Sequence, residues 1–93
     1  MRSTWDPVKG RLNIARRGIS FVEASSVLRD PLALTIPDRN HWDDEARELT
    51  IGLSSAHRLL VVYHVEREGL IRIIGARLPT TKERRDHDEE SRS

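Results

Sequence analysis

Residues 59–77 have the sequence LLVVYHVEREGLIRIIGAR, and this stretch indicates the centre of a β-sheet. The pair Glu68-Gly69 is typical of a hairpin turn, and it separates strands that we predict at 59–66 and 70–78. The first of these strands begins with consecutive apolar residues and is therefore apolar on both faces. That pattern favours a central position in the sheet.

Alternating residues predict two more strands before this hairpin, at 32–36 and 47–53. A polar, turn-rich segment at 37–44 separates them, and residues 54–57 form a further hairpin turn. Strands joined by such turns pair with their neighbours in the chain, so we expect a four-stranded antiparallel meander.

The chain before the sheet predicts a short strand at 3–6 and then a helix. Asp6-Pro7 marks the start of the helix, because aspartate caps a helix and proline suits its first position. Gly18 has the residue type that commonly follows the last turn of a helix. An apolar stripe at helical spacing consists of Val8, Leu12 and Ala15.

A second helix is predicted to begin at once. Ser20 and Glu23 form a capping box, in which the serine accepts a backbone hydrogen bond and the glutamate reaches back to the backbone of the serine. The helix ends before Asp30-Pro31, because a residue that precedes proline avoids the helical region. Its expected buried side consists of Phe21, Ala24, Val27 and Leu28.

Thr80 and Glu83 predict another capping box, which opens a charged C-terminal helix. The whole order predicts the α+β class: a short N-terminal strand, two helices, the four-stranded meander and the C-terminal helix. We expect a single domain over residues 1–85 and a polar tail, 86–93, that frays.

Composition limits the classes of function. The chain has 93 residues, a formal net charge of +1 and no cysteine, which excludes disulfides and thiolate chemistry. No signal peptide is visible, and no apolar run is long enough to span a membrane, so we expect a cytoplasmic protein that does not bind membranes. A domain this small has marginal stability, which leaves room for a dimer or a partner.

The arginines of the last predicted strand are the informative charged residues. Arg72 interrupts an otherwise apolar run, and an unpaired charge in mid-strand is costly unless it faces water. Strand alternation puts Arg72 and Arg77 on opposite faces, unless a β-bulge at Gly75 redirects one of them. Two interpretations remain open: Arg72 forms a cross-strand ion pair with Glu66, or the arginines bind phosphate, whose oxygens match the guanidinium fork.

The sequence shows no metal-binding motif. The four histidines stand far apart in the chain, without the spacing of metal ligands. They are His41, His57, His64 and His87. We interpret them as surface or strand residues and expect no metal site.

Many short segments, in order, resemble the BrnT toxins of bacterial type II toxin–antitoxin systems. The resemblance begins in the predicted helical region. It is carried there by Trp5-Asp6-Pro7, Lys9, Asn13, Gly18-Ile19-Ser20-Phe21, Glu23-Ala24 and Asp30-Pro31-Leu32-Ala33. It continues through the strands in Glu45, Arg47, Ile51-Gly52, Leu59-Leu60-Val61-Val62, Ile71-Arg72-Ile73-Ile74-Gly75-Ala76-Arg77, Thr80 and Glu83-Arg84-Arg85.

This resemblance implies a compact RelE-like fold and a ribonuclease that needs no metal or other cofactor and inhibits translation. It also implies a cognate BrnA-like antitoxin with a ribbon–helix–helix domain, through which alone the complex would contact operator DNA. On this basis the candidate catalytic residues are Arg47, Glu66, Arg72 and Arg77. Lys9, Arg16 and Arg17 are candidates for RNA binding, and Lys9 is a second proton-transfer candidate beside Glu66.

The chain departs from the family pattern at three places. Arg16-Arg17 stands where the family usually has Lys-His, Gly75 where it has Ser, and Leu78-Pro79 where it has a basic residue and Ala. Arginine cannot move protons as histidine does. A second interpretation therefore stays open, in which the chain is a weak or inactive homologue that acts as antitoxin partner and transcriptional co-repressor. A stand-alone DNA-binding regulator lacks support, because no basic recognition helix is evident.

Overall fold

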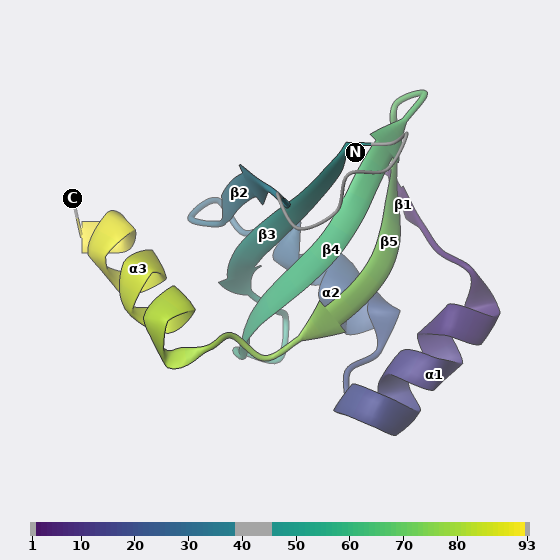
Figure 1. The fold of residues 1–93 in the computed structure, drawn as a ribbon, viewed down its shortest axis with the longest axis horizontal. Helices are drawn as coiled ribbons and strands as arrows, with labels where there is room; N and C mark the ends of the chain where they lie inside the picture. The colour runs from purple at the N-terminus through teal and green to yellow at the C-terminus, as the bar shows by residue number, and fades with distance from the viewer. Residues whose placement is uncertain (1, 39–45, 93) are drawn as a thin grey trace.

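The structure is a computed structural model that describes residues 2–38 and 46–92, and Figure 1 shows its fold. Within these two ranges, three helices and five strands follow one another along the chain. In chain order they are β1 (Arg2–Thr4), α1 (Pro7–Arg17), α2 (Phe21–Val27), β2 (Leu34–Pro37), β3 (Arg47–Leu53), β4 (Leu59–Arg67), β5 (Leu70–Arg77) and α3 (Thr81–Arg92). Residues 39–45, which include most of the predicted turn at 37–44 as well as His41 and Glu45, lie outside the described part.

The predicted α+β class is confirmed, and the sheet has one strand more than expected. Its strand order is β1-β5-β4-β3-β2, so β2 to β5 form the antiparallel meander and β4 lies at the centre. The N-terminal strand joins as a fifth strand, parallel to β5. Its three residues pair through the backbone, and no side-chain pattern in the sequence identifies the strand with which they pair.

Helix α1 begins and ends where the sequence predicts. The side chain of Asp6 accepts from the backbone N–H of Val8, and Gly18 adopts the left-handed conformation after the last turn. The apolar stripe, however, faces solvent: Val8 and Leu12 are 53% and 44% exposed. The side of α1 that packs inward carries Gly10 and Asn13 instead.

Helix α2 supplies the core as predicted. Phe21, Ala24 and Val27 are buried against the face of the sheet that carries Leu60 and Val62 of β4. The rest of this cluster consists of Ile19, Ile73 and Ala76, with Trp5 and Leu28 partly buried against it. One apolar core therefore holds α2 and the residues around it against the sheet.

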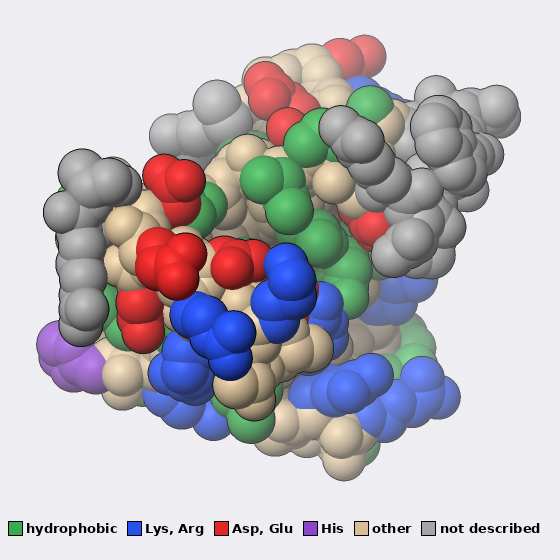
Figure 2. Space-filling model, turned by 60° about the vertical axis from the view of Figure 1, so that its left-hand side comes forward, with side chains coloured by type: hydrophobic (Ala, Val, Ile, Leu, Met, Phe, Trp, Pro, Cys, Tyr) green, Lys and Arg blue, Asp and Glu red, His purple; other side chains and the backbone are tan. Residues whose placement is uncertain are grey.

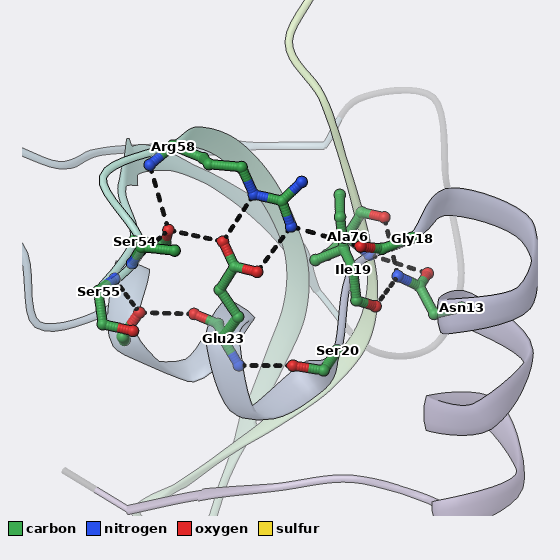
Figure 3. A network of polar contacts seen from close by, with 11 residues as sticks. Asn13, Gly18, Ile19, Ser20, Glu23, Ser54, Ser55, Arg58 and Ala76 are labelled. Atoms are coloured by element: carbon green, nitrogen blue, oxygen red, sulfur yellow. Dashed lines mark hydrogen bonds and ion pairs between the residues drawn. The ribbon is translucent and has the colours of Figure 1, made fainter.

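The capping box of α2 forms only in part. The Ser20 hydroxyl accepts from the backbone N–H of Glu23 at 3.0 Å, but the Glu23 carboxylate does not reach back to Ser20. It receives two hydrogen bonds from Arg58, at 2.6 and 2.9 Å, and one from the Ser54 hydroxyl at 2.7 Å (Figure 3). The hydrogen bonds from Arg58 lower the pKa of Glu23, and they tie α2 to the turn between β3 and β4.

Helix α3 has the complete capping box that the sequence predicts. Glu83 donates its backbone N–H to the Thr80 hydroxyl, and the Glu83 carboxylate accepts from the backbone N–H of Thr80. The helix continues to Arg92, past the domain boundary expected at residue 85, and stands apart from α1 and α2 (Figure 1). Among the described residues, no helix is long and apolar enough to cross a membrane.

Candidate functional site

A β-bulge in β5 brings the two informative arginines to one face. Tyr63 pairs with Gly75 and His64 pairs with Ile73, so Ile74 is an extra residue in β5. Ile73 and Ala76 both point into the core beneath α1 and α2. Because neighbouring residues of a strand point to opposite faces, Arg72 and Arg77 both lie on the other face, which we call the open face.

Three strands bring cations together at one end of the open face. Val65 of β4 pairs with Arg47 on one side and with Arg72 on the other. The structure describes no hydrogen bond or ion pair for either arginine side chain. Arg67 and Arg72 also line a pocket of about 170 Å³, whose lining includes Glu68 as well. Among the described residues no ion pair joins a carboxylate to Arg47 or Arg72, so this end of the face offers these two guanidinium groups to an anion.

Arg77 differs, because a carboxylate already occupies its fork. Its two terminal nitrogens donate to the two carboxylate oxygens of Glu83 at 2.7 and 2.9 Å. Its Nε donates to the hydroxyl of Tyr63 at 2.6 Å, and its guanidinium lies 5.5 Å from the centre of the Tyr63 ring. Arg77 therefore positions Tyr63 and the start of α3, and its charge is largely balanced.

The Arg77–Glu83 pair predicts a loss of stability in acid. The hydrogen bonds from Arg77 lower the pKa of Glu83 to about 2. Because the folded-state pKa lies below the unfolded value, the pair stabilises the fold fully above about pH 4.5 and loses this contribution as the pH falls toward 2. The loss is at most about 3 kcal/mol, since one pKa unit corresponds to about 1.4 kcal/mol. Chemical unfolding at a series of pH values would measure it.

The control for this prediction is Glu83→Gln, which removes the titrating group. Its free energy of unfolding should be lower at pH 7 and should fall less than that of the wild type between pH 4.5 and 2. Equal acid dependence in the two proteins would show that other carboxylates control it.

The open face continues from Arg77 into a groove beside α3. The groove has a volume of about 410 Å³, and its sheet side is apolar, with Leu34, Ile36 and Ile51. Its helix side carries acidic residues, among them Glu83 and Asp86. Figure 2 shows an apolar strip with acidic side chains on one side of it and Lys and Arg side chains below. The acidic wall makes this part of the face less suited to a polyanion than the end with Arg47 and Arg72.

Glu66 lies on the opposite face from the arginines. It lines a pocket of about 250 Å³ beside the end of α2, together with Glu48, Thr50 and His64. His64 is 4% exposed, and its Nε2 lies 2.7 Å from the hydroxyl of Thr50. Burial lowers the pKa of His64, and the negative charges of Glu48 and Glu66 act in the opposite direction. The sheet therefore separates the predicted proton-transfer group, Glu66, from the predicted phosphate-binding arginines.

The structure does not form the ion pair between Glu66 and Arg72. Ile71, not Arg72, stands opposite Glu66 in the register, and the two charged side chains point to different faces. The ion pair on β5 belongs to Arg77, whose partner comes from α3. Each of the two interpretations therefore applies to a different arginine. Arg77 forms a structural ion pair, and Arg72 stays available to an external anion.

The candidate RNA-binding residues of the first helix are not part of the open face. Lys9, Arg16 and Arg17 are exposed on α1, which contacts β5 beside the core shared with α2. The departure at Arg17 therefore takes no group away from the open face.

Gly75 faces the ring of Tyr63, where an added Cβ would lie 3.6 Å from the nearest ring atom. That is ordinary van der Waals contact, so glycine at this position is not forced by packing.

Sequence analysis missed two residues of the open face. Tyr63 lies between the two ends of the arginine set, and its hydroxyl is held by Arg77. Arg67 lies two residues after Val65 and therefore shares its face. The alternation of β4 carries a signal for both, because residues 63, 65 and 67 share one face. The sequence does not reveal the position of the β-bulge, and it is this bulge that puts both Arg72 and Arg77 on the same face as these residues.

Comparisons with known proteins identify the family and a similar fold. A family model described as "Ribonuclease toxin, BrnT, of type II toxin-antitoxin system" matches residues 5–83. The crystal structure of the Brucella abortus ribonuclease toxin BrnT is similar in fold, with a TM-score of 0.67 and 20% sequence identity, over 87% of this chain and 100% of that chain. A search of curated proteins finds no match. Since the family model covers most of the chain, the protein belongs to the BrnT family of ribonuclease toxins of type II toxin–antitoxin systems.

Proposed function

We propose that the chain is a metal-independent endoribonuclease that inhibits translation and binds RNA on the open face of the sheet. The observation that carries this proposal is the β-bulge at Ile74, which puts Arg72 and Arg77 on the face of the sheet that also carries Arg47 and Tyr63. Guanidinium groups on rigid strands suit the stabilisation of charge that develops on a phosphate during cleavage. Arg72 and Arg47 are the phosphate-binding groups, because no carboxylate contacts them in the described part of the chain.

Tyr63 takes a different proton-transfer role from the one that the sequence suggested for Glu66 or Lys9. It gives a proton to the leaving 5′-oxygen, while the proton of the attacking 2′-hydroxyl passes to water. Its hydroxyl accepts from Arg77, so its own hydrogen stays available to donate to a substrate oxygen. A phenol held beside a guanidinium can protonate the leaving 5′-oxygen, because the positive charge stabilises the oxygen that loses the proton. Arg77 acts here as a positioning residue through Tyr63.

The cognate antitoxin follows from the type II class of the family, and we propose that it has a BrnA-like ribbon–helix–helix domain that contacts operator DNA for the complex. The alternative, an inactive homologue that serves only as co-repressor, rests on the departures at Arg17 and Gly75. Arg17 lies on α1, so its departure removes no group from the open face. Gly75 lacks the hydroxyl that the usual serine would carry on that face beside Tyr63, but the cations Arg47 and Arg72 are present there. These cations favour the active enzyme.

The test of this function is cleavage of a single-stranded RNA by the purified chain in excess EDTA. Cleavage should proceed at the same rate as in magnesium buffer, because fixed arginines replace the charge that a metal ion would supply. Loss of cleavage in EDTA that magnesium restores would contradict the metal-independent mechanism. A folded protein that cuts no RNA in either buffer would favour the co-repressor alternative.

A further inference from the structure

The apolar stripe of α1 lies on the side of the helix that faces away from the core. Val8, Leu12 and Ala15 recur at i, i+4 and i+7, so they share one face of the helix, and all three are exposed. Surface helices of globular proteins normally turn such a stripe toward the core. Here an amphipathic helix presents its apolar side to solvent.

Specific contacts on the other side of α1 hold this orientation. An added Cβ on Gly10 would lie 3.4 Å from the Trp5 ring, so the helix packs closely there. The Asn13 amide donates to the backbone oxygens of Ile19 and Ala76, at 2.9 and 3.1 Å, and accepts from the backbone N–H of Ala76 (Figure 3). The position of α1 therefore depends on Gly10 and Asn13, and the apolar stripe does not pack against the core.

Cations flank the stripe on both sides. At 100° per residue, Arg11 lies on one side of the stripe, and Lys9 and Arg16 lie on the other. Helix α1 contains no acidic residue, and the side chain of Asp6, just before it, is engaged in capping. The exposed surface is thus an apolar strip with a basic rim.

We propose that this surface of α1 is a docking site for an acidic amphipathic helix of the cognate antitoxin. Apolar side chains of the partner would cover Val8 and Leu12, and its carboxylates would meet the rim, as in other helix-on-helix recognition. The antitoxin itself follows from the type II class of the family, and the proposal rests on that part of the proposed function. It does not depend on ribonuclease activity.

The composition of the surface distinguishes this partner from others. RNA would use the cations but gains nothing from a solvent-facing Val8 and Leu12. A second copy of the chain docked through the same helix would bring like charges together, which is unfavourable. A membrane surface would be held by only three apolar side chains of modest size, and weak apolar area gives weak interfacial binding.

The experiment measures the affinity of the full chain for the purified antitoxin, produced from the gene adjacent to that of this chain. The double variant Val8→Gln/Leu12→Gln removes the stripe and keeps the charge, and Arg11→Glu reverses one rim charge. The double variant should weaken binding at least ~10-fold, as loss of a central interface contact does. Arg11→Glu should also weaken binding, and it should reduce the dependence of the affinity on salt, because a charge on the rim acts on association. Wild-type affinity should also fall as salt is raised. The control is Val22→Gln, which alters a 69% exposed residue of α2 outside the stripe.

Unchanged antitoxin affinity in both α1 variants would overturn the proposal. Wild-type dimers in solution that the double variant makes monomeric, or wild-type binding to anionic phospholipid vesicles that it abolishes, would assign the stripe to a second copy or to a membrane instead. RNA cleavage by the variants should equal that of the wild type, because the stripe is separate from the open face. If the chain proves to lack ribonuclease activity, the antitoxin affinities still decide the docking site.

Discussion

Replacing Arg72 by alanine should lower the rate of RNA cleavage at least ~100-fold without changing the fold. Loss of one preorganised charge contact to the transition state has an effect of this size. Arg72 is exposed on the open face, and no ion pair of the described residues includes it, so its removal leaves no buried group without a partner. The measurements are single-turnover cleavage of a defined RNA and the melting temperature.

Two further variants test whether the loss of cleavage is due to Arg72 itself. Arg29→Ala removes an exposed arginine at the end of α2, away from the open face, and should leave cleavage unchanged. Arg77→Ala should lower both cleavage and the melting temperature, because it releases Tyr63 and Glu83 together. If Arg72→Ala lowers the melting temperature as strongly as it lowers activity, the residue is structural and the phosphate assignment is wrong.

A single 2′-deoxynucleotide at the cleaved position of the RNA should abolish cleavage there. A mechanism without a metal-bound hydroxide uses the 2′-hydroxyl as nucleophile, and the deoxy substrate lacks it. The phosphates stay the same, so binding to Arg47 and Arg72 should persist and the modified RNA should act as a competitive inhibitor. Cleavage products separated on a denaturing gel would report the first effect, and competition with unmodified RNA the second.

The control substrate carries the deoxynucleotide several positions away from the cleaved bond and should be cut at the normal rate. Cutting at the deoxy position, or cutting of the corresponding DNA at a comparable rate, would show that water or another nucleophile attacks the phosphorus. The 2′-hydroxyl mechanism would then be wrong, and the end groups of the products would show whether the 5′-oxygen that Tyr63 protonates is still the leaving group.

Local interactions explain what the sequence determined by itself. Asp6, Gly18 and the Thr80–Glu83 pair place helix ends correctly, because caps and left-handed glycines act within one turn of the backbone. Alternation and turn residues place the meander, with the apolar start of β4 at its centre. The match to BrnT toxins over residues 5–83 confirms the family that these segments indicated.

Tertiary structure alone decided how these elements present their side chains. The bulge at Ile74 depends on the register between β4 and β5, and it decides that Arg72 and Arg77 share a face while Glu66 lies on the other. The direction of the α1 stripe depends on the hydrogen bonds of Asn13 to Ala76, 63 residues away in the chain. Glu83 caps α3 as predicted but also binds Arg77, a contact between elements that no local pattern contains. Caps and turns are encoded within a few residues, whereas the face on which a charged side chain lies is set by contacts between segments that meet only when the chain folds.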